Sequence, residues 1–396
     1  MGFGEVKRRD AVPSIRCSSV RTARRAFACA SFLLLTTLGT GAAETKRVLM
    51  LHSFGRDFKP WSEYARNIRS ELDQQSRWAL EIRDISLMTT GSDDQASEAP
   101  FVEYLRALYA KRPVDLIVSF GAPAIAFLQR QRQQLFATTP KLFAAVEHRR
   151  IQYSTLTEND TVVAVAHSFP AVFQSVLQVL PDTKVLAVVN GNSPNEKFWS
   201  AEIRRDTAGF VNRLTFKWYN ELPFEDVLNA AATLPTQSAI FWHSMHVDAA
   251  GTVHEEDKAL QRLHAVANAP IFSFIDASFG NGIVGGPMHS VVEGSRLAAS
   301  VAVRILGGER PGDIKTPATG FAAPKFDWRE MRRWGISERR LTPGSEIYFH
   351  DPTVWEQYRA QILIACAVIL LQAALIFWLF YQRGRRRSSN TEAHEL

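Results

Sequence analysis

The chain has 396 residues, of which 46% are hydrophobic and 22% are charged, so it can bury a large globular core. Its formal net charge of +6 comes from the two ends. Residues 1–43 hold seven basic and two acidic residues, and residues 361–396 hold four and two, which leaves 35 basic and 36 acidic residues in 44–360. A nucleic-acid-binding domain is therefore not expected.

The N-terminal segment has the order of a secretory signal peptide. Arg21, Arg24 and Arg25 precede an apolar run at 26–38, and small residues at 39–43 follow. The run is shorter than the roughly 18 to 20 apolar residues of a membrane span. We expect cleavage near Ala43; Arg24 and Arg25 leave both the general secretory and the twin-arginine route open.

Short β-rich runs and helical patterns alternate along residues 44–360. The predicted strands are 47–54, 80–87, 114–120, 141–146, 161–166, 184–190, 213–218, 238–242 and 270–275. The predicted helices are 61–75, 98–110, 123–134, 196–208, 224–234 and 255–267. This alternation predicts an α/β fold of two doubly wound parallel-sheet lobes.

The same pattern predicts the domain boundaries. Lobe 1 is expected at 44–180, completed by 277–325, and lobe 2 at 181–276, with the passage at Pro181 and Asp182. A membrane-proximal stalk is expected at 326–360.

Ligands of such sheets bind beyond the carboxyl ends of the strands, so the turns that follow the strands are the expected binding site. These turns carry hydroxyl, amide, imidazole and aromatic groups, with glycines that allow close backbone approach. Single Ser, Asn or Gly residues are also ordinary turn formers, so the prediction rests on the set. The expected ligand contacts are Ser53, Phe54, Phe120, Gly121, Asn190, Asn192, His243 and Asp276. Trp61, Phe120, Trp199 and Trp242 are further candidates for stacking on a ligand, or for the core.

Residues 361–381 contain no charge and would span about 31 Å as a helix, which matches the hydrocarbon core of a bilayer. Trp378 and Tyr381 suit an interfacial aromatic belt, and Arg383 and Arg385–Arg387 follow. We therefore expect a single-pass inner-membrane protein with residues 44–360 in the periplasm and a short cytoplasmic tail at 382–396.

Other chemistry finds little support in the sequence. Cys17, Cys29 and Cys366 lie in the leader and the span, which excludes a disulfide framework or a cysteine metal site in the exported part. His243, His246, Asp248 and His254 could supply metal ligands, but solvated loop residues are the favoured interpretation. The sequence has neither a Gly-x-Ser-x-Gly elbow nor a phosphate-binding Walker motif. No catalytic machinery, metal or cofactor is expected.

Several segments together resemble ABC-transporter-type solute-binding proteins, and more closely the periplasmic sensor region of membrane histidine kinases built on that fold. They are VLMLHSFG (48–55), VDLIVSFGAPA (114–124), LPDTKVLAVVNGNSP (180–194), DAAGT (248–252), FGNGIVGG (279–286) and FDWREMRRWGISERRL (326–341). A helix at 290–306 belongs to the same resemblance, which covers nearly all of 45–382. It implies a periplasmic-binding-protein fold with a ligand cleft between two lobes and crossing strands as a hinge, and it implies no particular ligand.

Such kinases continue past the membrane with a phosphoacceptor helix and an ATP-binding domain, whereas this chain has fifteen residues after Tyr381. We therefore expect a membrane-anchored solute sensor that signals by lobe closure to a separate partner such as a histidine kinase. The alternatives are a tethered receptor that delivers a solute to an ABC permease, or a truncated sensor kinase. The junction into the span has no flexible Gly/Ser linker, which favours the sensor.

Overall fold

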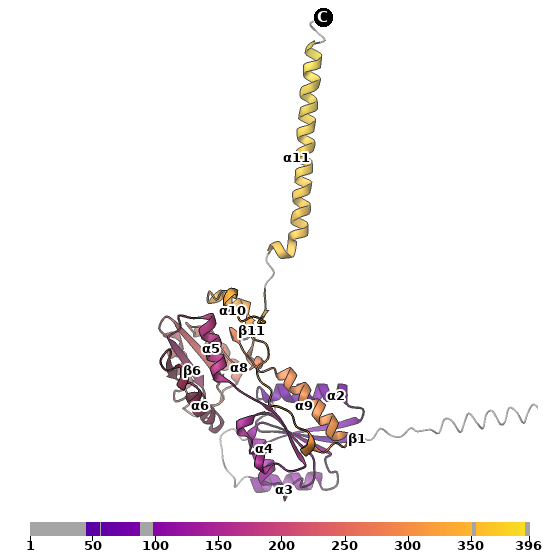
Figure 1. The fold of residues 1–396 in the computed structure, drawn as a ribbon, viewed down its shortest axis with the longest axis vertical. Coiled ribbons are helices and arrows are strands. Elements are labelled where there is room, and N and C mark those ends of the chain that lie inside the picture. The colour runs from indigo at the N-terminus through magenta and orange to yellow at the C-terminus, as the bar shows by residue number, and fades with distance from the viewer. Residues whose placement is uncertain (1–44, 56, 88–97, 351–353, 393–396) are drawn as a thin grey trace, which may run out of the picture.

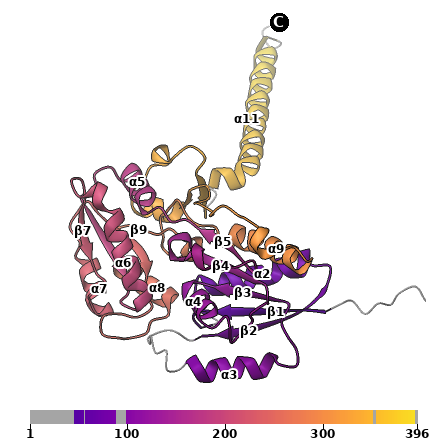
Figure 2. The same ribbon diagram turned by 60° about the horizontal axis from the view of Figure 1, so that its bottom comes forward.

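The computed structural model describes residues 45–55, 57–87, 98–350 and 354–392. These residues form two parallel β-sheets flanked by helices, a small third sheet and one long projecting helix (Figures 1 and 2). The predicted α/β class with two doubly wound lobes is confirmed. The predicted signal peptide lies outside the described residues.

The first lobe is built on a sheet with the strand order β2-β1-β3-β4-β5, in which every neighbouring pair is parallel. Its strands are β1 (Thr45–His52), β2 (Ala79–Ser86), β3 (Leu116–Phe120), β4 (Lys141–Glu147) and β5 (Asp160–Val165). Both faces are covered, by α2 (Trp61–Gln75) and α9 (Val291–Leu306) on one side and by α3 (Glu98–Tyr109) and α4 (Ala122–Arg130) on the other.

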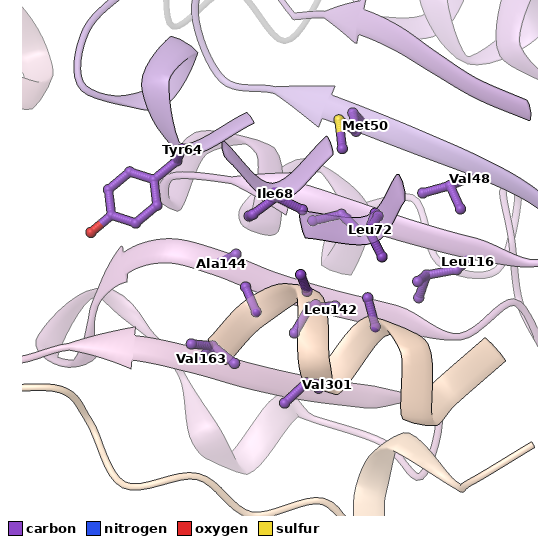
Figure 3. Packing of buried hydrophobic residues seen from close by; sticks show 14 of the residues in the cluster. Val48, Met50, Tyr64, Ile68, Leu72, Leu116, Leu142, Ala144, Val163 and Val301 are labelled. Atoms are coloured by element: carbon purple, nitrogen blue, oxygen red, sulfur yellow. The ribbon is translucent and has the colours of Figure 1, made fainter. Parts of the chain in front are cut away.

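Strand β1 contributes side chains to the core on both faces of the sheet, since successive side chains of a strand point to opposite faces. Val48 and Met50 lie in the cluster with α2 and α9, and Leu49 and Leu51 lie in the cluster with α3 and α4. Figure 3 shows the first cluster, where side chains of the sheet meet those of the two helices. Burial on both faces explains why these strands appear in the sequence as continuous apolar runs.

The second lobe has the strand order β7-β6-β8-β9, again all parallel. Its strands are β6 (Val185–Asn190), β7 (Thr215–Trp218), β8 (Ser238–Ser244) and β9 (Ile271–Phe272). One face packs against α5 (Phe169–Val179) and α6 (Pro194–Asp206), and the other packs against α7 (Phe224–Ala232) and α8 (Glu256–Val266).

The structure differs from the sequence in where the chain enters the second lobe. The passage was predicted at Pro181 and Asp182, but α5 already shares the buried cluster of β6 and β8 through Phe169 and Phe173. The chain therefore crosses before α5. No helix was predicted there because the segment FPAVFQSVLQV has no charged residue to mark an outer face.

Three segments of the described chain run between the lobes, at 166–168, 287–290 and 319–324, and they are bonded to one another. The Ala166 amide donates to the Thr319 carbonyl at 2.8 Å, and the Ala322 amide donates to the Met288 carbonyl at 2.9 Å. A hinge of the kind that the resemblance implies is expected at these paired crossings.

A third sheet of β10 (Gly285–Gly286), β11 (Lys325–Asp327) and β12 (Glu346–Tyr348) lies beside the second lobe together with α10 (Trp328–Arg333). Phe326, Met331 and Ile336 are buried in the core of that lobe. The first part of the predicted stalk therefore belongs to lobe 2. Gly285 has φ +138°, and a Cβ atom there would lie 2.1 Å from the Lys325 carbonyl oxygen, so the close β10–β11 pairing needs glycine.

The long helix α11 (Val354–Glu392) projects from the globular part (Figure 1). Within its segment Gln357–Arg383, an 18-residue window has a mean hydropathy of 2.7 and is not buried against the rest of the described chain. At 1.5 Å per residue the 27 residues of the segment extend about 40 Å, so its length and composition allow it to cross a membrane. The predicted span at 361–381 lies inside this segment.

Candidate functional site

A cavity lies between the two lobes, at the carboxyl ends of the strands of both sheets. It is partly open to solvent. Its wall consists of Pro60, Trp61, Tyr64, Gly121, Ala122, Ala145, Val146, Glu147, Arg150 and Val165 from the first lobe, Asn195, Trp199, His243, Ser244, His246 and Glu256 from the second, and His167, Phe274, Ile275 and His289 between them.

Aromatic side chains form much of this wall. The Trp61 indole nitrogen donates to the Ala145 carbonyl at 3.1 Å, which fixes the ring at the start of α2. Trp199 stands on α6, and its ring lies 5.7 Å from the ring of His243. The ring of Phe274 stacks on that of His243 at 5.2 Å. These rings offer flat apolar surfaces for the body of a ligand.

Two histidines on the crossing segments form the floor of the cavity. The rings of His167 and His289 lie 4.7 Å apart, and burial lowers the pKa of His289 to about 4 and the pKa of His167 well below its usual range. Both imidazoles are therefore neutral near pH 7. The carbonyl of Gly320 takes one ring N–H of His289, and Nε2 has no partner among the described residues. That buried nitrogen is a lone-pair acceptor without a partner, in a ring that lines the cavity.

His243 presents a second acceptor of the same kind. The Asn190 side-chain nitrogen donates to the Glu196 carbonyl at 2.7 Å, so its Oδ1 faces the His243 Nδ1 at 2.9 Å. Burial lowers the pKa of His243 to about 3, so the ring is neutral and its single proton sits on Nδ1. Nε2 then carries the lone pair.

One charged cluster supports the second-lobe side of the cavity. His246 lies between two carboxylates, with Nδ1 3.3 Å from Glu196 Oε1 and Nε2 3.1 Å from Glu256 Oε2. Burial alone would lower its pKa, but the two carboxylates outweigh burial and raise the pKa of His246 to about 10. Although burial opposes ionisation, bonds from His246 and Ser193 lower the pKa of Glu196 to about 2. The Glu196 carboxylate also closes a capping box with Ser193 at the start of α6.

Arg150 is the cation most suited to bind an anionic group. It lies in the 3₁₀ turn His148–Arg150, where its Nη1 donates to Asn195 Oδ1 at 2.8 Å and its guanidinium lies 4.2 Å from the ring of Phe198. Within the described residues no carboxylate lies within 4 Å of it. Burial lowers the pKa of Arg150, yet arginine remains charged at neutral pH. A carboxylate or phosphate of a ligand would match its planar fork.

The two lobes touch on both sides of the cavity. Lys59 Nζ lies 2.9 Å from Asp257 Oδ2, and the ring of Phe58 stacks on His246 at 4.1 Å. Arg149 reaches across to α6, with Nη1 3.1 Å from Glu202 Oε2. The structure therefore represents a conformation in which the lobes are closed on each other.

The structure places the predicted site residues in two groups. Gly121 and His243 line the cavity. The others lie behind its wall: Ser53 Oγ donates to the Phe120 carbonyl and accepts from the Ala124 amide at 2.9 Å, and Phe120 and Asn190 are fully buried. Asp276 caps α9 through the Val291 amide at 3.0 Å. The Asn192 amide donates to the Val247 carbonyl at 2.6 Å, and Phe54 stacks on Phe58.

Sequence reasoning missed the floor of the cavity. His167 and His289 were not predicted because they lie on crossings, whose neighbours depend on how the lobes meet. His167 does follow β5 by two residues, so the expectation that ligands bind at turns after strands could have included it. Tyr64, Glu147 and Arg150 were also missed, whereas Trp61 and Trp199, proposed as stacking candidates, line the cavity.

The four residues considered for a metal site have separate partners, and that of His243 is Asn190. His254 Nε2 lies 3.0 Å from Asp248 Oδ2, and His246 is held by Glu196 and Glu256. Within the described residues no group of three or more His, Cys, Asp or Glu is arranged to hold a metal ion.

Neither family models nor curated proteins match this chain. Solved structures do. An ABC domain from Streptococcus pneumoniae in complex with L-Trp is 16% identical, with a TM-score of 0.54 over 77% of this chain and 100% of the other. A conserved domain protein from Vibrio cholerae is 17% identical, with a TM-score of 0.54 over 76% and 100%.

A ligand-free, open substrate-binding protein with adhesive properties from Clostridium difficile is 13% identical, with a TM-score of 0.52 over 77% of this chain and 100% of the other. At these identities the likeness concerns the fold. The chain thus has the two-lobed periplasmic-binding-protein fold of ABC-type solute-binding proteins, with the cavity between the lobes.

Proposed function

We propose that this chain is a receptor for a small organic solute, which binds in the cavity between the lobes. The observation that carries the proposal is the make-up of that cavity. Residues of both lobes and of two crossing segments meet there, with the buried His289 Nε2 left without a partner. An unpaired buried acceptor costs free energy that a ligand donor would recover.

The wall sets the features of the ligand. The ligand should carry N–H or O–H donors for the neutral nitrogens of His243 and His289 and an anionic group for Arg150. It should also have an apolar or planar body that packs against Trp61, Trp199 and Phe274. A solute that touches His167 and His289 touches the crossings themselves, so its binding is coupled directly to the hinge.

A screen for stabilisation of the full chain in detergent tests this proposal. Candidate solutes that combine these features are compared by thermal shift, and a true ligand at a hundredfold excess over Kd stabilises the protein by about 2.7 kcal/mol. Trp199→Ala and Arg150→Met remove the response, whereas Trp78→Ala, an aromatic loss outside the cavity, retains it. A ligand whose stabilisation survives both cavity variants contradicts the assigned site.

We further propose that α11 anchors the receptor in the inner membrane with the lobes in the periplasm, and that lobe closure is relayed to a separate partner such as a histidine kinase. Two observations support a relay. Phe326 and Met331 are part of the lobe 2 core, and the chain from β12 reaches α11 within a few residues. Because the connection is short, movement of lobe 2 would be transmitted to the helix.

The alternative is a tethered receptor that delivers its solute to an ABC permease. Lengthening the chain between His350 and Val354 distinguishes the two functions. Insertion of six Gly/Ser residues there abolishes ligand-dependent signalling if α11 relays closure. Delivery tolerates a loose tether, so uptake that continues while ligand binding is unchanged would support the transport receptor instead.

A further inference from the structure

A group of exposed arginines lies at the end of the second lobe that leads into α11. We define the membrane-proximal arginine surface as Arg332 at the end of α10 and Arg339 and Arg340 in the turn Glu338–Arg340. All three side chains are exposed. The two segments are held together by the burial of Met331 and Ile336 in the lobe 2 core.

The three guanidinium groups are not neutralised by ion pairs. Within the described residues none of the three has a carboxylate within 4 Å. Arg332 lies over the Trp328 ring at 4.7 Å, and Arg340 donates to the Val179 carbonyl at 3.2 Å. The neighbouring Arg329, by contrast, is paired with Asp327 at 2.6 Å.

This surface is tied to the base of the projecting helix. The ring of Trp328 lies 4.4 Å from that of His350, and the Arg329 guanidinium lies 4.2 Å from the Phe349 ring. Val354, where α11 begins, follows His350 by four residues, which span at most about 14 Å. Figure 1 places α10 and β11 at the end of the globular part that is nearer to α11.

Exposed aromatic residues accompany the arginines. Tyr348 is 39% exposed, Phe349 is 44% exposed and Trp355, in the first turn of α11, is 54% exposed. Large aromatic rings beside arginines are characteristic of surfaces at the level of lipid head groups, where the rings lie in the interface and the guanidinium groups bind phosphates.

We propose that the membrane-proximal arginine surface docks on anionic lipid head groups of the leaflet that α11 enters. The inference rests on the proposed anchoring by α11 and adds that lobe 2 lies against the bilayer. The charge favours this occupant, since three exposed arginines without a carboxylate partner lie on α10 and the turn that follows it, and α10 contacts the segment that leads into α11. Docking would hold lobe 2 still, so that closure moves lobe 1 relative to the membrane.

The test uses the full chain in vesicles of phosphatidylcholine alone or with 30% phosphatidylglycerol. Backbone hydrogen exchange in 328–341 is expected to slow by about tenfold when the anionic lipid is present, and the difference should disappear in 0.5 M salt. Arg339→Glu/Arg340→Glu should abolish the difference, and Arg339→Lys/Arg340→Lys should retain most of it. The matched control is Lys111→Glu/Arg112→Glu, an exposed basic pair at the end of α3, which should retain it in full.

Extraction with alkaline carbonate separates this inference from the anchoring on which it rests. If the chain stays in both kinds of vesicle while exchange in 328–341 is the same in both, lipid docking is refuted and anchoring stands. If carbonate releases the chain from both, anchoring fails and this inference fails with it.

Discussion

The neutral histidines around the cavity should make the protein sensitive to mild acid. The folded state keeps His243, His289 and His167 unprotonated, with pKa values of about 3, about 4 and well below the usual range, because all three are buried. In the unfolded chain each protonates near pH 6.5. The unfolded state therefore binds more protons as the pH falls, and the free energy of unfolding decreases below about pH 6.5.

The size of the effect follows from these values. Between pH 7.0 and 5.5 a histidine with an unfolded pKa of 6.5 and a folded pKa of 4 or below costs about 1.2 kcal/mol of stability. His243 and His289 together cost about 2.5 kcal/mol, and the lowered pKa of His167 adds to this loss. His246, whose folded pKa is raised to about 10, offsets about 0.8 kcal/mol over the same interval, because unfolding releases its proton. The loss continues until the pH passes through the folded pKa values, so the window extends from about pH 6.5 to pH 4 for His289.

His289→Gln tests the assignment. Glutamine can still donate to the Gly320 carbonyl but cannot take up a proton, so its stability should fall by about 1.2 kcal/mol less than that of the wild type between pH 7.0 and 5.5. Urea unfolding of the full chain in detergent, followed by tryptophan fluorescence, measures the difference. Ile203→Val, which removes one buried methyl group from the core of lobe 2, should lower stability by about 1 kcal/mol equally at both pH values. If the His289→Gln curve runs parallel to the wild type, that imidazole is not buried and neutral.

Three other changes have outcomes that the contacts predict. Glu196→Gln should lower the free energy of unfolding by about 3 kcal/mol, because the buried carboxylate accepts hydrogen bonds from three backbone amides and the Ser244 hydroxyl. Glu225→Gln, in an exposed ion pair, should lower it by less than about 1 kcal/mol in the same urea titration. Gly285→Ala should lower the free energy of unfolding, measured by thermal melting, by about 3 kcal/mol or more, since the new Cβ clashes with a backbone carbonyl oxygen. Gly55→Ala, with open space around the new Cβ, should stay within about 0.5 kcal/mol of the wild type. Lys59→Met removes an ion pair between the lobes and should weaken binding of a ligand found in the screen by up to about fivefold in calorimetry; unchanged affinity would mean that this contact does not favour closure.

Regular patterns in the sequence predicted most elements within a few residues, because local chemistry determines their ends. Helix α2 was predicted with its observed bounds, and Ser193, Pro194 and Glu196 start α6 as a capping box with a first-turn proline. Local chemistry is also why α5, without charged residues, was missed.

The edge of the sheets that forms the cavity was predictable from topology, but the side chains that line it were only partly so. Ser53 follows a strand end as expected, yet its hydroxyl bonds to the Phe120 carbonyl and so joins two strand ends from behind the wall. His167 and His289 reach the cavity because crossings from distant parts of the chain pair with each other. That arrangement depends on tertiary packing, which a single sequence does not display.

The position of α9 affects how the chain can fold as it emerges. Seven of the 20 buried residues in the cluster between α2 and the first sheet come from α9, which begins at Val291. The first lobe therefore remains incomplete until more than 240 residues after β1 have been made, and the part of the apolar side of α2 that packs on α9 has no cover in the meantime. Because these contacts span most of the chain, closing them should be slow relative to completion of the second lobe. A nascent chain released before α9 would present that apolar side to chaperones and proteases as a sign of unfinished synthesis.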